Sequence, residues 1–269
     1  LTKIGESAFF ACSGITSIDF PESLIEIGES AFKNCTGLGK FEIPGNLEII
    51  GKEAFSGCRN IKEITLPSSI KVIGASAFEN CKGISEITIP EGVVELPTSA
   101  FKGCSGLVTV SLSETTEQIG DSAFYGCTKI ESIDISHVKY LGAEVFSNCS
   151  SLVSIEIPSG VTAVGDSLFE KCRKLETIKL PDTIETIGAS AFASCSSIVS
   201  ITIPDNVSMI GDNAFEGCSK LTSIHIPDKI KKIGMSSFKD CSALQSVTGM
   251  KGVTEIGYKA FSNCRKLSE

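Results

Sequence analysis

Few of the residues that commonly build ligand pockets or metal sites are present. The 269 residues include no tryptophan, three tyrosines and two histidines, and aromatic residues make up only 7% of the chain. Small-molecule pockets rely on aromatic side chains, and many metal sites rely on histidine. We therefore expect neither a cofactor nor a metal ion in this chain.

A surplus of basic residues is also missing. The chain has 24 Lys and Arg against 32 Asp and Glu, a net charge of −8 and an isoelectric point near 5.0. Nucleic acids and anionic membrane surfaces bind clustered Lys and Arg, so the totals argue against both as partners. No stretch approaches the roughly 20 apolar residues of a membrane helix, and no signal peptide is visible at Leu1.

A strict repeat runs through the whole sequence. Its twelve cysteines lie 23 residues apart, except for a spacing of 22 between Cys127 and Cys149. A phenylalanine stands three residues before each cysteine, from Phe9 to Phe261. The unit reads I-G-x-x-A-F-x-x-C-x-x-L-x-x-I-x-I-P-x-x-V-x-x. A period of this length indicates stacked repeats, because one unit cannot bury its own apolar residues and neighbouring units can.

The I-x-I-P part of each unit predicts a short strand. Apolar residues that alternate with polar ones, as at Ile224 and Ile226, are typical of a strand with one buried face. The proline that follows has no amide to donate and ends the strand. Eleven of these strands are complete in the chain, and stacking is expected to join them in a parallel sheet.

The A-F-x-x-C part of each unit predicts a single helical turn. Its apolar residues lie at positions i, i+1 and i+4, which places them on one face of a helix. The residue before Cys is Asn, Gly or Asp in nine of the twelve units, as at Asn34 and Gly57, and predicts a left-handed residue at the exit. Because helical turns are bulkier than strands, we expect the sheet on the concave side and the helical turns on the convex side.

These motifs resemble the leucine-rich repeats of the BspA-like family of bacterial and protist surface proteins. The resemblance covers the whole chain. It implies an α/β fold, a right-handed leucine-rich-repeat solenoid with a parallel β-sheet on the concave face and short helical turns on the convex side. We expect residues 1–269 to form a single array of about twelve turns, with both ends cut within a repeat. The resemblance also implies a cell-surface or secreted location and a protein partner.

The cysteines are interpreted as buried free thiols that fill the core. No C-x-x-C pair or nearby Cys-His set with the spacing of a zinc site occurs. Stacking brings neighbouring cysteines close together, but their side chains should point in parallel, which does not suit the geometry of a disulfide.

The outward positions of the predicted strands are the candidate binding residues. Two columns run along this face, one between the paired Ile positions and one two residues earlier. The first four strands bring four carboxylates together, which predicts an acidic contact patch for a basic partner, although a solvated polar face explains them as well. The candidate binding residues are Asp19, Glu42, Glu63, Thr65, Glu86, Thr88, Asp134, Glu156, Lys179 and His225.

The sequence favours a binding scaffold over an enzyme. An enzyme needs a nucleophile with an oriented base, a carboxylate pair in a pocket, or a metal. The two histidines, His137 and His225, lie four units apart, and no G-x-S-x-G or H-E-x-x-H motif occurs. We therefore predict no catalytic residues and no enzymatic activity. A host or bacterial surface protein is the expected partner, and a passive spacer that holds another domain is the alternative function.

Overall fold

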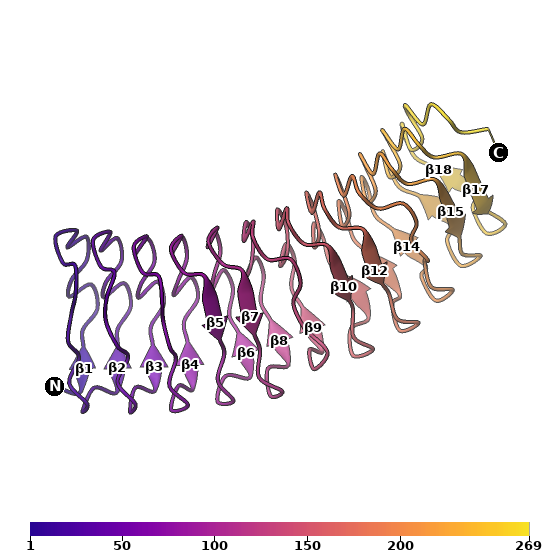
Figure 1. The fold of residues 1–269 in the computed structure, drawn as a ribbon. Helices are drawn as coiled ribbons and strands as arrows, with labels where there is room; N and C mark the ends of the chain where they lie inside the picture. The colour runs from indigo at the N-terminus through magenta and orange to yellow at the C-terminus, as the bar shows by residue number, and fades with distance from the viewer. Residues whose placement is uncertain (269) are drawn as a thin grey trace. The chain divides into compact units, whose positions relative to one another are not determined.

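The computed structural model describes residues 1–268 as stacked coils of about 23 residues each, and contacts divide the chain into two compact units, Leu1–Ile133 and Asp134–Glu269. Each coil contributes a two-residue strand that ends just before the glycine of the I-G pair, or before Pro97 in the coil where Leu96-Pro97 replaces that pair (Figure 1). In the first unit these strands are β1 (Lys3–Ile4), β2 (Glu26–Ile27), β3 (Ile49–Ile50), β4 (Val72–Ile73), β6 (Glu95–Leu96) and β8 (Gln118–Ile119). In the second they are β9 (Tyr140–Leu141), β11 (Ala163–Val164), β13 (Thr186–Ile187), β14 (Met209–Ile210), β16 (Lys232–Ile233) and β18 (Glu255–Ile256).

A second set of strands lies on the other side of the coils, at the predicted I-x-I positions. They are β5 (Glu86–Thr88), β7 (Thr109–Ser111), β10 (Ser154–Glu156), β12 (Thr177–Lys179), β15 (Ser223–Ile226) and β17 (Ser246–Gly249). The prediction of eleven strands here holds for these six. In the other five coils the equivalent segments are extended without strand pairing, apart from a bridge between Ser17 and Lys40.

The pairing is parallel and follows the repeat period. Ile4 pairs with Ile27 in the first unit, and Ile187 pairs with Ile210 in the second. Each residue therefore lies beside its equivalent in the next coil, and a side chain repeated in sequence becomes a continuous column in space. No proline of the described residues lies in a strand, as the missing amide predicts.

The phenylalanine column forms the centre of both cores. In the first unit, the ring of Phe78 is stacked between those of Phe55 and Phe101 at centroid distances of 5.7 and 5.4 Å. In the second unit, Phe192 stacks on Phe215 at 5.2 Å with an interplanar angle of 15°. All four of Phe55, Phe78, Phe192 and Phe215 are fully buried. The apolar columns predicted from the repeat therefore do form the shared core.

The prediction of short helical turns is wrong, because no helix occurs in residues 1–268. The A-F-x-x-C segment is a series of tight turns in which two residues have positive φ, for example Ser30 at 52° and Asn34 at 61°. An α-helix needs φ near −63° at every residue. In these turns, alternate main-chain N–H groups donate hydrogen bonds to carbonyls of the next coil. The N–H of Phe32, for example, donates to the carbonyl of Ala54 in the next coil at 2.8 Å.

The predicted left-handed residue before Cys is confirmed in all twelve coils. It includes the three coils in which the residue is Ala11, Lys171 or Ser194, where the side chain gives no local advantage. The fold therefore imposes this conformation on whatever residue occupies the position.

The cysteines are free and mostly buried, as predicted, but they also donate hydrogen bonds. Ten are buried, Cys264 is half-buried and Cys12 is exposed. The Sγ of Cys104 lies 3.1 Å from the carbonyl oxygen of Phe78, and that of Cys218 lies 3.2 Å from the carbonyl oxygen of Phe192. In both cases the acceptor belongs to the preceding coil. The thiol therefore links successive coils, a role that an alanine of similar size cannot perform.

Thiol labelling of the native protein should accordingly modify Cys12 fast and the ten buried cysteines slowly. The reactive form is the thiolate, and burial raises the pKa of Cys104 and Cys218 to about 12. Mass spectrometry after a short exposure to iodoacetamide, with and without denaturant, measures the difference. Rapid native labelling of Cys104 or Cys218, or a mass that indicates several disulfides, would contradict the buried column.

Candidate functional site

The exposed side chains of the I-x-I segments form a face, which we call the strand face. In β5 the central Ile87 is buried, whereas Glu86 and Thr88 on either side of it are exposed. The same alternation occurs in β10, where Ile155 is buried between two exposed residues. All ten candidate binding residues are exposed, six in the first unit and four in the second.

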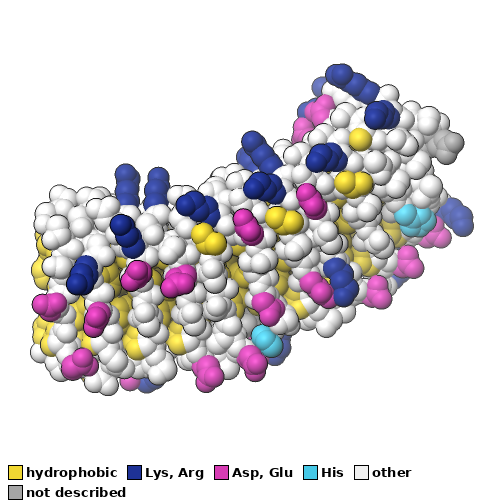
Figure 2. Space-filling view, in the orientation of Figure 1, with side chains coloured by type: hydrophobic (Ala, Val, Ile, Leu, Met, Phe, Trp, Pro, Cys, Tyr) yellow, Lys and Arg dark blue, Asp and Glu magenta, His cyan; other side chains and the backbone are white. Residues whose placement is uncertain are grey.

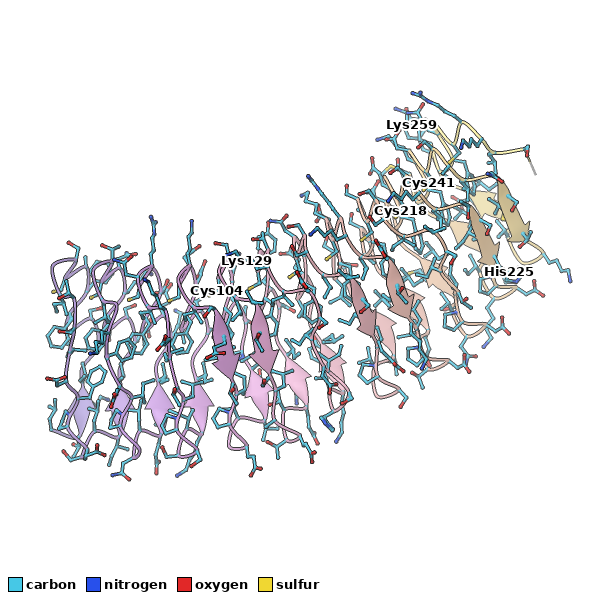
Figure 3. All side chains as sticks on the ribbon, viewed as in Figure 1. Cys104, Lys129, Cys218, His225, Cys241 and Lys259 are labelled. Carbon is cyan, nitrogen blue, oxygen red and sulfur yellow. The ribbon has the colours of Figure 1, made fainter. Side chains whose placement is uncertain are left out.

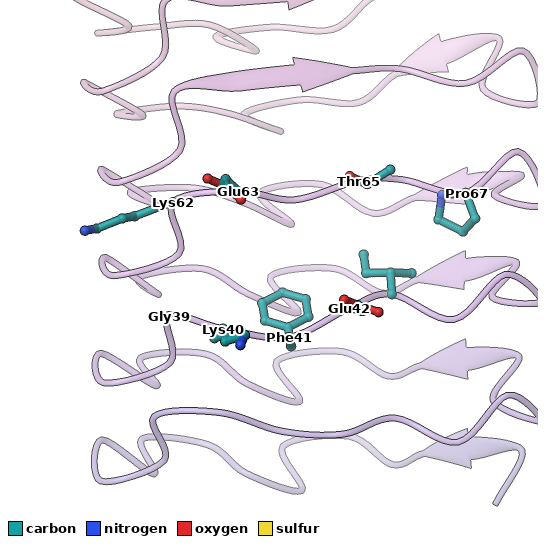
Figure 4. A pocket seen from close by; sticks show the side chains of 9 residues that line it. Gly39, Lys40, Phe41, Glu42, Lys62, Glu63, Thr65 and Pro67 are labelled. Carbon is teal, nitrogen blue, oxygen red and sulfur yellow. The ribbon is translucent and has the colours of Figure 1, made fainter.

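In the first unit, the strand face has a shallow hollow that combines both charge signs (Figure 4). Glu42 and Glu63 line it together with two lysines, Lys40 and Lys62. The patch predicted to be acidic is therefore a mixed one, because Lys40 stands in one of the two predicted columns but the prediction counted only the carboxylates. Lys62 stands one residue before the two columns, so a pattern limited to those columns does not find it.

Apolar side chains form part of the same hollow. Phe41 and Ile43 line it and are half-buried, next to Pro67. Phe41 stands where most coils have Ile, and its ring stacks on that of buried Phe55 at 5.2 Å with an interplanar angle of 9°. The core thus holds the ring of Phe41 in place while part of it stays accessible. Thr65 lines the hollow beside Glu63, and Asp19 and Glu42 line an adjoining one.

In the second unit, the charged candidates are engaged with their neighbours. Lys179 and Glu156, on paired strands, form an ion pair at 2.5 Å. His225 Nδ1 lies 3.0 Å from the hydroxyl of Thr248. His225, labelled in Figure 3, also lines a hollow with hydroxyl residues that include Ser200 and Ser223.

Asp134 has a local structural role. Its carboxylate accepts a hydrogen bond from the main-chain N–H of Ser136 at 2.9 Å. This bond lowers the pKa of Asp134 below its usual value, because it stabilises the charged form. Ser136 stands where other coils have the proline that follows the strand. The Asp134 side chain therefore closes the turn that proline would otherwise shape.

No group of three or more His, Cys, Asp or Glu side chains in residues 1–268 is arranged to hold a metal ion. Within the same residues, no helix is long and apolar enough to span a bilayer. The strand face thus presents charges, hydroxyls and a partly accessible aromatic ring.

Comparison with protein families gives one match. The model described as "BspA type Leucine rich repeat region (6 copies)" matches residues 1–107, 73–180 and 163–269, which together span the chain. No curated protein shows significant similarity.

Several solved structures are similar. A leucine-rich repeat protein from Bacteroides ovatus shares 32% identity over 100% of this chain and 81% of its own, with a TM-score of 0.68. A leucine-rich cell surface protein from Faecalibacterium prausnitzii shares 28% identity over 92% of this chain and 83% of its own, with a TM-score of 0.55. The leucine-rich repeat protein of T. pallidum shares 29% identity over 68% of this chain and 78% of its own, with a TM-score of 0.52.

Proposed function

Because the chain belongs to the BspA-type leucine-rich repeat family, we propose that it is a non-enzymatic binding scaffold that holds a protein partner on its strand face. The proposal extends to its setting, as part of a cell-surface protein that mediates adhesion. The similar protein from F. prausnitzii is described as a cell surface protein, which supports that setting.

The observation that carries the proposal is the contrast between the inside and the outside of the coils. Phe and Cys occupy their inward columns in all twelve coils. On the strand face, the corresponding columns hold acids, bases, hydroxyls and a histidine. Stacking depends on the inward columns alone, so the outward positions are available for recognition. A protein partner would recognise the varied outward side chains, whereas a passive spacer would not require such variation.

The first unit offers the better contact site of the two. Its hollow combines a partly accessible Phe41 with the carboxylates of Glu42 and Glu63, and Asp19 lines the adjoining hollow. None of these three carboxylates forms an ion pair within residues 1–268. Protein interfaces commonly place an aromatic anchor inside a polar rim. Glu86, Thr88 and Thr65 extend the same face. In the second unit, Glu156 and Lys179 already neutralise each other.

Charge reversal of Asp19, Glu42, Glu63 and Glu86 to Lys is expected to weaken association with a basic partner, mainly through a slower on-rate that depends less on salt. The experiment captures proteins from a surface extract on the immobilised chain and compares what the parent and variant retain. Association rates of the recovered partner are then measured at several salt concentrations. The fold should be unchanged, because all four side chains are exposed.

The matched control reverses Glu6, Glu91, Glu95 and Glu114, which are exposed carboxylates of the same unit away from the strand face. Both variants change the net charge equally. Retention of the partner by the control and its loss by the strand-face variant support the proposal. Equal losses in the two variants would contradict the assignment to this face, and the absence of any retained protein would favour the passive spacer.

A further inference from the structure

The loop that follows each cysteine has a charge pattern of its own. Its two residues directly after Cys are never acidic in any of the twelve coils. In the second unit this loop contains five basic residues, Arg173, Lys174, Lys220, Arg265 and Lys266. We call the edge formed by these residues the Cys-loop edge.

The opposite edge of the second unit has mostly the reverse charge. There the loops after the strand-ending prolines contain Asp182, Asp205 and Asp228, with Lys229 and Lys251 beside them. In the space-filling view, Lys and Arg side chains gather along the border where Cys218 and Cys241 lie in the stick view (Figures 2 and 3). Although the whole chain has a net charge of −8, one edge of the second unit is therefore basic.

The cations of the Cys-loop edge have no carboxylate partners within residues 1–268, unlike several other exposed lysines of this unit. Lys232 pairs with Glu255 at 2.7 Å, and Lys179 pairs with Glu156. None of the five edge cations forms an ion pair within residues 1–268, and all five are exposed. Their positive charge is thus available to a ligand.

The carboxylates nearest to this edge are mostly occupied by other lysines. Glu170 pairs with Lys171 at 2.7 Å, and Glu216 pairs with Lys239 at 2.5 Å. Asp240 also lies 3.6 Å from the ammonium group of Lys239. Glu176, two residues beyond Lys174, and Glu269, three residues beyond Lys266, are the remaining acids close by in sequence. Nearby carboxylates therefore neutralise little of the positive charge of the five cations.

Main-chain amides add a second kind of donor for anions at the same positions. The Cys loops are β-turns closed by the N–H of Leu175, Leu221 and Leu267, each donating to the carbonyl of the preceding Cys at 3.0, 3.1 and 3.1 Å. The third residue of each turn is Lys174, Lys220 or Lys266. Its own N–H donates to no acceptor within residues 1–268. A free amide beside an exposed ammonium group suits a carboxylate or sulfate.

The spacing of the basic loops is regular. They occur after Cys172, Cys218 and Cys264, which is every second coil, and Ser196-Ser197 and Ser242-Ala243 fill the coils between. At about 4.8 Å per coil, the basic loops repeat at roughly 10 Å. Along the axis of a duplex, each strand carries one phosphate per about 3.4 Å, which is a finer spacing, and the loops have no aromatic ring on which the bases of a single strand could stack.

We propose that the Cys-loop edge of the second unit binds a linear acidic polysaccharide whose carboxylate or sulfate groups recur at every second sugar ring. A pyranose ring is about as long as one coil is thick, so one disaccharide spans the step between basic loops. Each loop contributes its side-chain cations and a free amide to one anionic position of the chain. This site is separate from the strand face and does not depend on its protein partner.

The test uses a variant in which Arg173, Lys174, Lys220, Arg265 and Lys266 are replaced by Ser, the residue that the chain itself has in neighbouring Cys loops. The control replaces Lys179, Lys229, Lys231, Lys232 and Lys251 by Ser, which removes the same charge from exposed positions elsewhere in the unit. Binding of a chondroitin sulfate decasaccharide is measured by calorimetry at several salt concentrations. Circular dichroism and the unfolding midpoint verify the fold of both variants.

The parent should bind the decasaccharide with an affinity that falls as salt rises. The edge variant should lose on the order of tenfold or more, and the control should stay within about twofold of the parent. No binding by the parent, or equal losses in both variants, would overturn the proposal. Tighter binding of oligo(dT) than of chondroitin sulfate, with the same sensitivity to the edge substitutions, would assign the edge to nucleic acid instead. Equal binding of uncharged dextran would exclude recognition of charge.

Discussion

Replacement of Phe78 by alanine is expected to lower the free energy of unfolding by about 3–5 kcal/mol. The side chain is fully buried, and its ring contacts a stacked ring on each side, Phe55 at 5.7 Å and Phe101 at 5.4 Å. Truncation removes both stacking contacts and leaves a cavity that rigid neighbouring coils cannot close. Urea unfolding followed by circular dichroism measures the loss.

The control for this prediction lies in the same column. Phe192 is also fully buried between two rings, and its truncation should cost a similar amount. Phe261 is half-buried and stacks only on Phe238, at 5.2 Å, so Phe261→Ala should cost clearly less. Equal and small losses at all three positions would mean that the column is not the shared core of the coils.

The sequence predicts the core well because one residue type repeats at one spacing. Stacking requires the equivalent residues of successive coils to meet, and the pairing of Ile4 with Ile27 shows that they do. A strict period in the sequence therefore fixes which side chains are neighbours in space, without any knowledge of the angle or curvature of the coils.

The helical turn could not be predicted correctly from the spacing of apolar residues alone. The pattern at Ala31, Phe32 and Cys35 fits one helical face, but Ser30 and Asn34 both adopt positive φ. Two left-handed residues four positions apart exclude a helix, because either one breaks the run of i to i−4 hydrogen bonds. The position of Asn34 gave a usable signal. The residue equivalent to Ser30 is Ser in eight coils. Unlike Asn or Gly, Ser has no preference for positive φ, so this position gave no signal.

The sequence predicts which residues are exposed on the strand face, but it did not predict the mixture of positive and negative charge there. Exposure of Glu42 and Glu63 follows from alternation along a strand. Their neighbours in space also include Lys40 and Lys62, which the close approach of adjacent coils brings into one hollow. Lys40 stands in one of the two outward columns and could have been counted from the sequence, whereas Lys62 precedes both columns and its position depends on how the loop leads into the strand.

Alkaline pH is expected to unfold the protein cooperatively, starting above about pH 9. Fully buried thiols have a raised pKa because burial disfavours the thiolate, among them Cys81, Cys104, Cys172, Cys195 and Cys218. For Cys104 and Cys218 the pKa is about 12. An unfolded thiol has a pKa near 8.5. Their contribution to stability is therefore complete below about pH 8.5 and is lost as pH rises towards about 12.

The magnitude follows from the number of protons released on unfolding. Between these two pKa values, each thiol lowers the free energy of unfolding by about 1.4 kcal/mol per pH unit. Cys104 and Cys218, with a pKa of about 12, together amount to roughly 4 kcal/mol at pH 10, a large part of the stability of a typical domain, about 5–15 kcal/mol. The raised pKa of Cys81, Cys172 and Cys195 acts in the same direction. Urea unfolding at pH 7, 8, 9 and 10 should show little change up to pH 8 and a steep fall afterwards.

The slope of that fall distinguishes the thiols from other groups that titrate in alkali. A variant with Cys104→Ala and Cys218→Ala starts from a lower stability, but its dependence on pH should be weaker by about two protons released per molecule. The absorbance of thiolate provides an independent measure and should rise together with the loss of circular dichroism. If thiolate forms gradually from about pH 8.5 while the circular dichroism is unchanged, the cysteines ionise inside the folded coils. The column of protonated thiols that donate to phenylalanine carbonyls would then be incorrect.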